Sequence, residues 1–145
     1  MSISFSLDIR LETNNSIHCR EIVEILLQNN WNILKNKKIA YLPINDNDMF
    51  DWTVSNMSIN EFLNLTDKKE DTNELIGVEI YWENTDIGGH LLLSSGTEFS
   101  FEWDINTIYL ESELRIPDFN WYAEKVIKSL KQYYHILDYK FSIIY

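Results

Sequence analysis

The sequence is poor in the residues that cross-link, break or loosen a chain. Its 145 residues include one cysteine, four glycines and two prolines. A single cysteine, Cys19, cannot form an intramolecular disulfide. So few glycines and prolines argue against a collagen-like or linker-like chain.

Long apolar runs are missing as well. No stretch of 18 apolar residues occurs, so no membrane-spanning helix is expected. The first residues, MSISFSLDIRLE, alternate polar and apolar side chains and lack the basic and apolar regions of a signal peptide. We therefore expect a soluble, cytoplasmic protein without a membrane partner.

Motifs for catalysis, cofactors or metals are also lacking. The sequence contains no GxGxxG, GxxxxGKS/T, GxSxG or HExxH pattern. Cys19 follows His18, but adjacent residues on a helix point about a hundred degrees apart and do not face each other. One cysteine and three scattered histidines do not supply the locally paired ligands of a structural zinc site. We expect no catalytic residue, no metal and no cofactor, and hence no enzyme.

The chain does have a globular composition and clear periodicity. With 45% hydrophobic and 14% aromatic residues, it predicts one globular domain over residues 1–145. Apolar side chains alternate from Ile3 to Leu11, which predicts a strand with one buried face. An apolar stripe at i, i+3, i+4 and i+7 from Cys19 predicts a helix, with Asn15 or Ser16 as its cap.

The remaining segments complete the predicted fold. Ser58 and Glu61 form a capping box, which predicts a short helix before a polar loop over 66–73. Residues 76–111 alternate like an antiparallel meander, Pro117 is placed to begin a long helix, and residues 138–145 predict a last strand. This order predicts an α+β fold: a single, largely antiparallel sheet with helices packed on a face.

Negative charge is concentrated in the middle of the chain. The formal net charge is −11, and residues 41–118 contain 17 acids against three bases, whereas both ends are slightly basic. The negative electrostatic potential of such a segment repels nucleic acid and speeds the encounter with a basic protein. The alternative is that the acidity only keeps the protein soluble.

The stretch NDNDMFDW, residues 45–52, joins acids to aromatics. An EF-hand loop beginning at Asp46 would need a glycine where Asp51 stands and a glutamate where Met57 stands, so this pattern fails. Aromatic anchors within a charged rim are typical of a protein interface, although a solvated acidic loop or an irregular calcium site stays open. The candidate partner-binding residues are Asp46, Asp48, Phe50, Asp51, Trp52, Glu70, Asp71, Tyr81, Glu83 and Asp86.

In size, acidity, Asn/Ile/Lys-rich composition and its ending, IPDFNWYAEKVIKSLKQYYHILDYKFSIIY, the chain resembles bacterial immunity proteins of contact-dependent growth inhibition and polymorphic toxin systems. The resemblance implies an antitoxin that binds a cognate toxin, such as a basic nuclease, stoichiometrically. Its acidic side chains would take the place of nucleic-acid phosphates at the active or substrate-binding site.

Two other classes of function stay open. Glu79 with Glu83 and Glu98 with Glu102 are spaced for one face of a strand, as in a small hydrolase that uses surface carboxylates. An adaptor that binds host proteins is the other alternative.

Overall fold

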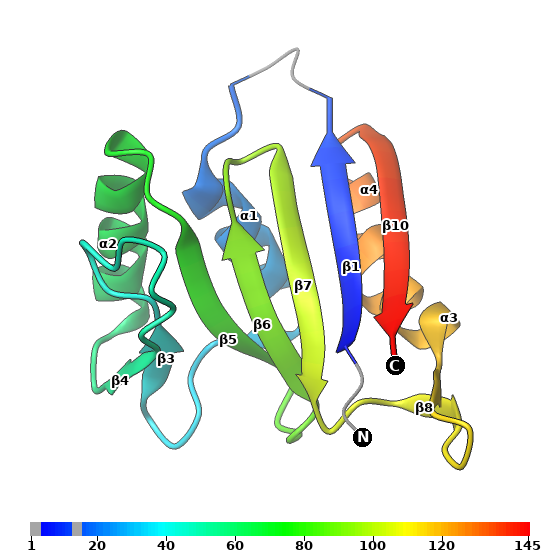
Figure 1. Ribbon diagram of the computed structural model, residues 1–145. Helices are drawn as coiled ribbons and strands as arrows, with labels where there is room; N and C mark the ends of the chain where they lie inside the picture. Colours follow the sequence, from blue (N-terminus) through cyan, green and yellow to red (C-terminus); the bar gives the residue numbers. More distant parts are fainter. Residues whose placement is uncertain (1–3, 13–15) are drawn as a thin grey trace.

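The computed structural model describes residues 4–12 and 16–145, and its centre is one large antiparallel sheet (Figure 1). Neighbouring strands follow the order β10-β1-β7-β6-β5-β3-β4, and β2 pairs with β5 beside this path. The strands are β1 (Ser4–Leu11), β2 (Trp31–Asn32), β3 (Ile39–Tyr41), β4 (Thr53–Ser55), β5 (Ile76–Trp82), β6 (Gly88–Leu93), β7 (Glu98–Ile105) and β10 (Ile136–Ile144). Two further strands, β8 (Tyr109–Glu111) and β9 (Ile116–Pro117), form a separate hairpin.

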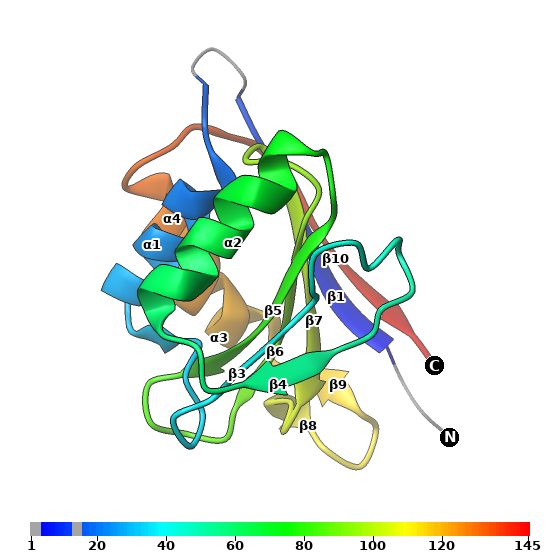
Figure 2. The same ribbon diagram turned by 90° about the vertical axis from the view of Figure 1, so that its left-hand side faces the viewer.

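The helices lie on one side of this sheet (Figure 2). They are α1 (Cys19–Gln28), α2 (Ile59–Asp71) and a C-terminal helix of α3 (Phe119–Tyr122), the π-helical turn η1 (Ala123–Ile127) and α4 (Lys128–Lys131). The chain between β3 and β4 crosses to the opposite side (Figure 2). The predicted α+β fold, with one antiparallel sheet and helices on a face, is therefore confirmed.

The core fills the space between the sheet and the helices. The predicted alternation of β1 is confirmed within the described residues, and Ile3 lies outside them. The predicted apolar stripe of α1 is confirmed as well. The buried side chains of these two elements are Phe5, Leu7, Ile9, Leu11, Cys19, Ile22, Val23, Ile25 and Leu26.

The start of α1 differs from the sequence prediction. The cap is His18 and not Ser16, and Asn15 lies outside the described residues. The carboxylate of Glu70, at the end of α2, accepts a hydrogen bond from the Cys19 amide at 2.7 Å, while Glu21 accepts one from the His18 amide at 2.8 Å. A long-range acceptor thus satisfies an orphan donor of the first turn, which local sequence does not reveal.

The capping box of Ser58 and Glu61 is confirmed, but the prediction of a short helix is wrong. The helix continues to Asp71, through the segment predicted as a polar loop, because Thr66 and Lys69 turn the same face to the core as Phe62. The prediction that Pro117 begins the last helix is also wrong, because Pro117 is the last residue of β9. The side chain of Asp118 caps that helix.

Candidate partner-binding surface

The side of the sheet away from the helices, here called the helix-free face, is strongly acidic. Along each strand, residues that alternate with the core side chains must point to this face. Its bases on the strands are Arg10, Lys140 and the titratable His90, and Lys35 reaches its margin, with Nζ 5.0 Å from the ring centroid of Tyr81. Its carboxylates are Asp8, Glu79, Glu98, Glu102, Asp104 and Asp138.

His90 lies near the centre of this face, on β6. Its ring Nδ1 is 2.8 Å from an oxygen of Asp104, and its Nε2 is 3.2 Å from an oxygen of Glu79. The other oxygen of Glu79 accepts a hydrogen bond from the Tyr81 hydroxyl at 2.8 Å. Burial by itself lowers the pKa of His90, but Asp104 and Glu79 outweigh it, so the pKa is raised. The site therefore favours an imidazolium held between two carboxylates.

Trp52 fixes the loop of residues 43–52 (the 43–52 loop) to this cluster. Its ring centroid is 4.5 Å from that of His90, with the planes inclined by 56°. The same ring lies over Gly77 of β5, where an added Cβ would come within 2.9 Å of Trp52 Cη2. Trp52 is thus half-buried and acts as the contact between the loop and the sheet.

Asp46 organises the loop from within. This residue is buried, and its two carboxylate oxygens accept hydrogen bonds from the amides of Phe50 and Asp51, each at 2.9 Å. Asn45, Asn47, Asp48 and Phe50 have φ values of 64°, 52°, 56° and 54°. Asparagine and aspartate tolerate this left-handed region better than other side chains, so the backbone itself accounts for much of the NDND sequence.

The base of the loop is anchored to α2. Lys69 is fully buried, and its Nζ donates hydrogen bonds to the carbonyl oxygens of Leu42 at 2.9 Å and Pro43 at 3.0 Å. A carboxylate oxygen of Glu74 accepts the amide hydrogen of Asn45 at 2.6 Å. Burial lowers the pKa of Lys69, and nearby carboxylates, Glu74 first, act in the opposite direction. The acidity of this segment therefore offsets part of the cost of burying an ammonium group.

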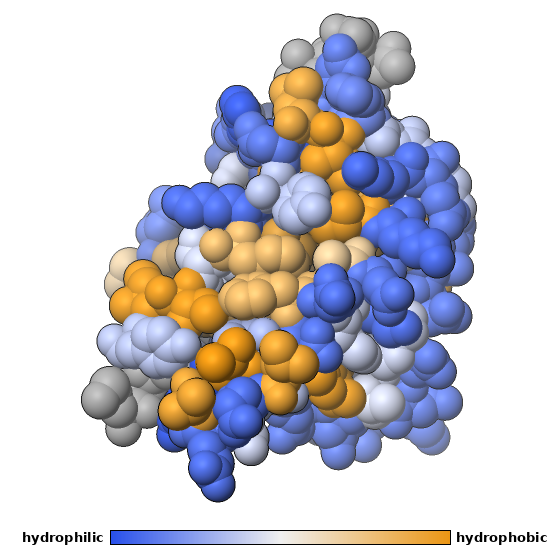
Figure 3. All heavy atoms as spheres, turned by 90° about the vertical axis from the view of Figure 1, so that its right-hand side faces the viewer, coloured by the Kyte–Doolittle hydropathy of each residue, from blue (hydrophilic) through white to orange (hydrophobic). Residues whose placement is uncertain are grey.

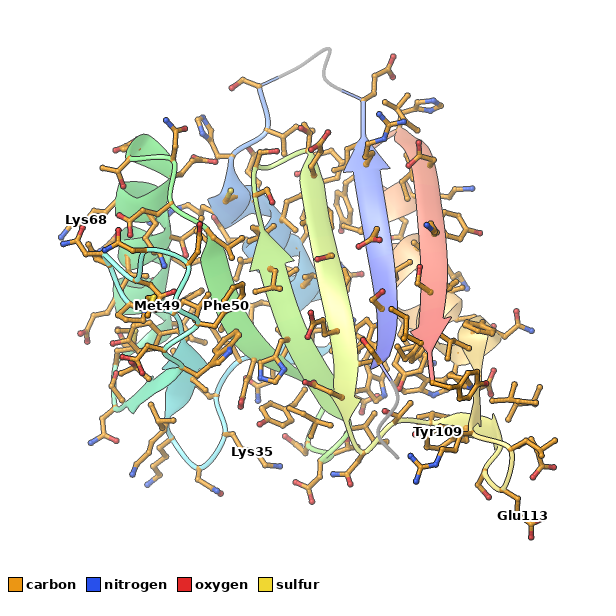
Figure 4. The ribbon with its side chains drawn as sticks, in the orientation of Figure 1. Lys35, Met49, Phe50, Lys68, Tyr109 and Glu113 are labelled. Atoms are coloured by element: carbon orange, nitrogen blue, oxygen red, sulfur yellow. The ribbon has the colours of Figure 1, made fainter. Side chains whose placement is uncertain are left out.

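The loop leaves apolar side chains exposed beside its outer acids. Met49 is 77% exposed and Phe50 is 48% exposed (Figure 4). Asp48 and Asp51 flank this pair and are exposed as well. An exposed apolar pair within an acidic surround has the composition of an interface anchor and its rim.

The other sequence candidates are spread along β5. Glu70 and Asp71 end α2 shortly before this strand, and Glu83 and Asp86 follow it in the turn to β6. The two pairs therefore lie at opposite ends of β5 (Figure 1). Of the candidates outside the 43–52 loop, Tyr81 alone joins the cluster below the loop, through Glu79 and His90.

Two of these candidates have internal partners. Glu70 contacts Nδ1 of His18 at 3.0 Å in addition to the Cys19 amide, and these hydrogen bonds hold its pKa below the ordinary value although burial acts to raise it. Asp86 forms an ion pair with Lys35, whose Nζ lies 5.0 Å from the Tyr81 ring centroid. Both carboxylates therefore contribute to the fold where they stand.

Sequence reasoning missed His90, Glu102 and Asp104 as parts of one site. Alternation put Glu102 and Asp104 on the polar side of their strand, which was the available signal, whereas His90 lies in the run GGHLLL, which does not alternate. Their proximity depends on the register that sets His90 opposite both Glu102 and Glu79, which in consecutive hairpins depends on the turns, and here also on a register shift between Gly88 and His90 that the sequence does not reveal.

Within residues 4–12 and 16–145, no group of three or more His, Cys, Asp or Glu side chains is arranged to hold a metal ion. In the same part of the chain, no helix combines the length and apolar character needed to cross a membrane. Comparison with protein-family models, curated proteins and solved structures finds no match.

Proposed function

We propose that this protein is an immunity protein that acts in the cytoplasm. It binds a cognate toxin with a basic active or substrate-binding surface, as in a nuclease, and covers that surface stoichiometrically. The helix-free face and the exposed part of the 43–52 loop form the contact surface. The observation that carries this proposal is the gathering of carboxylates on one face beside exposed apolar side chains.

The charge distribution supports a basic partner. Glu98 and Glu102 are exposed on β7, and Asp8 is exposed on the neighbouring β1. Arg10 is the base set among them, opposite Glu98, and its guanidinium is already bound to Asp138. A basic surface would thus meet several carboxylates at once, which speeds association and selects against acidic partners.

Different residues of the loop have different roles in this proposal. Asp46 and Trp52 are positioning residues, because their polar atoms or ring face the protein itself. Phe50, with Met49, supplies apolar contact, while Asp48 and Asp51 supply charge at the rim. Truncation of a central aromatic anchor commonly costs more binding free energy than removal of a rim charge.

The test begins with co-purification of the chain with the product of the neighbouring gene, followed by association rates at low and high salt. The double variant Glu98→Gln/Glu102→Gln removes two charges from the helix-free face. We expect its association rate to fall roughly threefold to tenfold at low salt and little at high salt, since screening removes long-range attraction. No complex, or a rate unaffected by the variant, would refute the proposed surface.

A matched control removes the same charge elsewhere. Glu111→Gln/Glu113→Gln alters two exposed carboxylates of the β8–β9 hairpin, outside the central sheet. This variant should associate at the unmodified rate at either salt concentration. An equal loss in both double variants would mean that net charge, and not the helix-free face, governs the encounter.

A small hydrolase is the second candidate, favoured by the close approach of His90 to two carboxylates. Turnover of a substrate by the isolated chain, lost in Glu79→Gln, would support it. Both ring nitrogens of His90 already face carboxylates and Trp52 lies against its ring, so the cluster also has a purely structural explanation.

A further inference from the structure

The outer edge of β10 is a long strand edge with no described strand beside it. β10 spans nine residues, ends the strand order and pairs on its inner side with β1. Proteins usually protect such an edge with proline, a bulge, short length or several charges, because its unpaired backbone groups accept another strand. β10 has no proline or glycine, its charged residues are Asp138 and Lys140, and its register shift against β1 lies near its start, at Leu137.

The edge is also lined by apolar side chains. Leu137, Tyr139 and Ile144 are exposed, with 69% of Ile144 accessible. Figure 3 shows a band of apolar side chains, flanked by hydrophilic ones, on the side of the molecule that β10 borders. A long, apolar and uncovered edge predicts that another strand pairs with it.

We propose that this strand is β10 of a second copy of the chain, paired antiparallel about a two-fold axis at Tyr139. This proposal is independent of the toxin-binding function and concerns the opposite side of the molecule from the 43–52 loop (Figure 1). The two sheets would continue into one, with both helix-free faces on the same side. Residues Asp138 to Lys140 of each copy would then lie opposite one another, as an isologous contact requires, and regular pairing would end at the register shift at Leu137.

The charges of β10 select this register. With the axis at Tyr139, Asp138 of each copy lies opposite Lys140 of the other, on the helix-free face. A shift of the axis by one residue toward the start of the strand opposes two aspartates, and a shift toward its end opposes two lysines. Opposite charges across a strand pair stabilise it and like charges destabilise it, so the Tyr139 register is favoured.

Neighbouring strands extend the charge pattern. Asp138 lies opposite Arg10, and Arg10 lies opposite Glu98 on its other side. The Nε of Arg10 donates hydrogen bonds to the two carboxylate oxygens of Asp138, at 3.1 and 3.3 Å. Lys140 lies opposite Asp8 and forms no ion pair within the described residues. In the dimer, one row would therefore read Glu98, Arg10 and Asp138, then Lys140 and Asp8 of the second copy, with alternating sign at every step.

The first experiment introduces a cysteine on the axis. Cα atoms of directly opposed residues in an antiparallel pair are about 4.5–5.5 Å apart, within the range of a disulfide. Tyr139→Cys should therefore form a covalent dimer under mild oxidation, while the buried Cys19 does not react. Ile144→Cys is the matched control, since two exposed residues five positions from the axis would be roughly 33 Å apart.

The second experiment changes charge and measures molar mass by sedimentation. The unmodified chain should sediment at twice the mass of one chain. Lys140→Glu places like charges at both symmetric positions, so its dimer dissociation constant should rise about tenfold to a hundredfold. Lys37→Glu makes the same charge change in an exposed turn away from β10 and should leave that constant unaltered.

Each result decides the proposal. Selective cross-linking through position 139, with a dimer weakened by Lys140→Glu while circular dichroism shows an intact fold, supports it. A monomeric chain that does not cross-link overturns it, as does equal cross-linking through positions 139 and 144. If the backbone amides at the edge of β10 become protected from hydrogen exchange only in the toxin complex, the toxin and not a second copy pairs with this edge, and the proposal is overturned.

Discussion

The structure predicts that the carboxylate of Asp46 holds the 43–52 loop while that of Asp48 does not. The variant Asp46→Ala removes the acceptor of two backbone hydrogen bonds, those of Phe50 and Asp51. A hydrogen bond to a charged acceptor contributes roughly 1.5–3 kcal/mol, and both are lost at once. If the loop opens as a unit, its opening free energy falls by about 3 kcal/mol or more, which corresponds to exchange faster by roughly 150-fold or more.

Amide hydrogen exchange measured by NMR tests this at the two donors themselves. The Phe50 and Asp51 amides should exchange faster in Asp46→Ala, while the sheet amides keep their rates. Asp48→Asn is the control, because the exposed Asp48 carboxylate accepts no hydrogen bond that holds the loop and asparagine tolerates the left-handed backbone of this position. Unchanged exchange in Asp46→Ala, or an equal increase in Asp48→Asn, would refute the assignment of Asp46 as the residue that holds the loop.

Three other positions give predictions that need only the isolated protein. Gly77→Ala would bring a Cβ within 3 Å of both Leu42 and Trp52, so denaturant unfolding should show a loss of about 1–3 kcal/mol. Because the pKa of His90 is raised, its ion pairs stabilise fully below pH 6.5 and progressively less above it, a dependence that His90→Gln should remove from unfolding curves. Burial raises the pKa of Cys19, so a thiol reagent should label it slowly until denaturant is added; fast labelling of the folded chain would contradict its burial.

The parts of the fold that follow a short period could be predicted from sequence. The alternation of β1 and the stripe of α1 depend on neighbours one to four residues apart, and both are present. The length of α2 could not be predicted in this way. The charge of Lys69 predicts an exposed loop residue. Lys69 is buried instead, because its ammonium group donates hydrogen bonds to the carbonyl oxygens of Leu42 and Pro43, more than twenty residues earlier in the chain.

The candidate surface, too, has features that the sequence predicts and others that depend on the folded structure. The acidic, aromatic character of residues 45–52 was visible in the sequence, but the inward orientation of Asp46 was not. The cluster of Glu79, His90 and Asp104 requires the pairing of β5 with β6 and of β6 with β7 in one register. Alternation alone does not fix that register, since it depends on the geometry of the two turns and on the register shift between Gly88 and His90.

Internal demands explain most of the stretch NDNDMFDW but not all of it. The left-handed backbone accounts for the asparagines, the two amides account for Asp46, and packing on His90 and Gly77 accounts for Trp52. Met49 and Phe50 have no such explanation, because both expose apolar surface and Phe50 does so in a backbone conformation that bulky residues rarely adopt. A side chain that gains little within its own fold is most simply explained by contact with a partner, so these two residues give the most direct support for a binding surface at the loop.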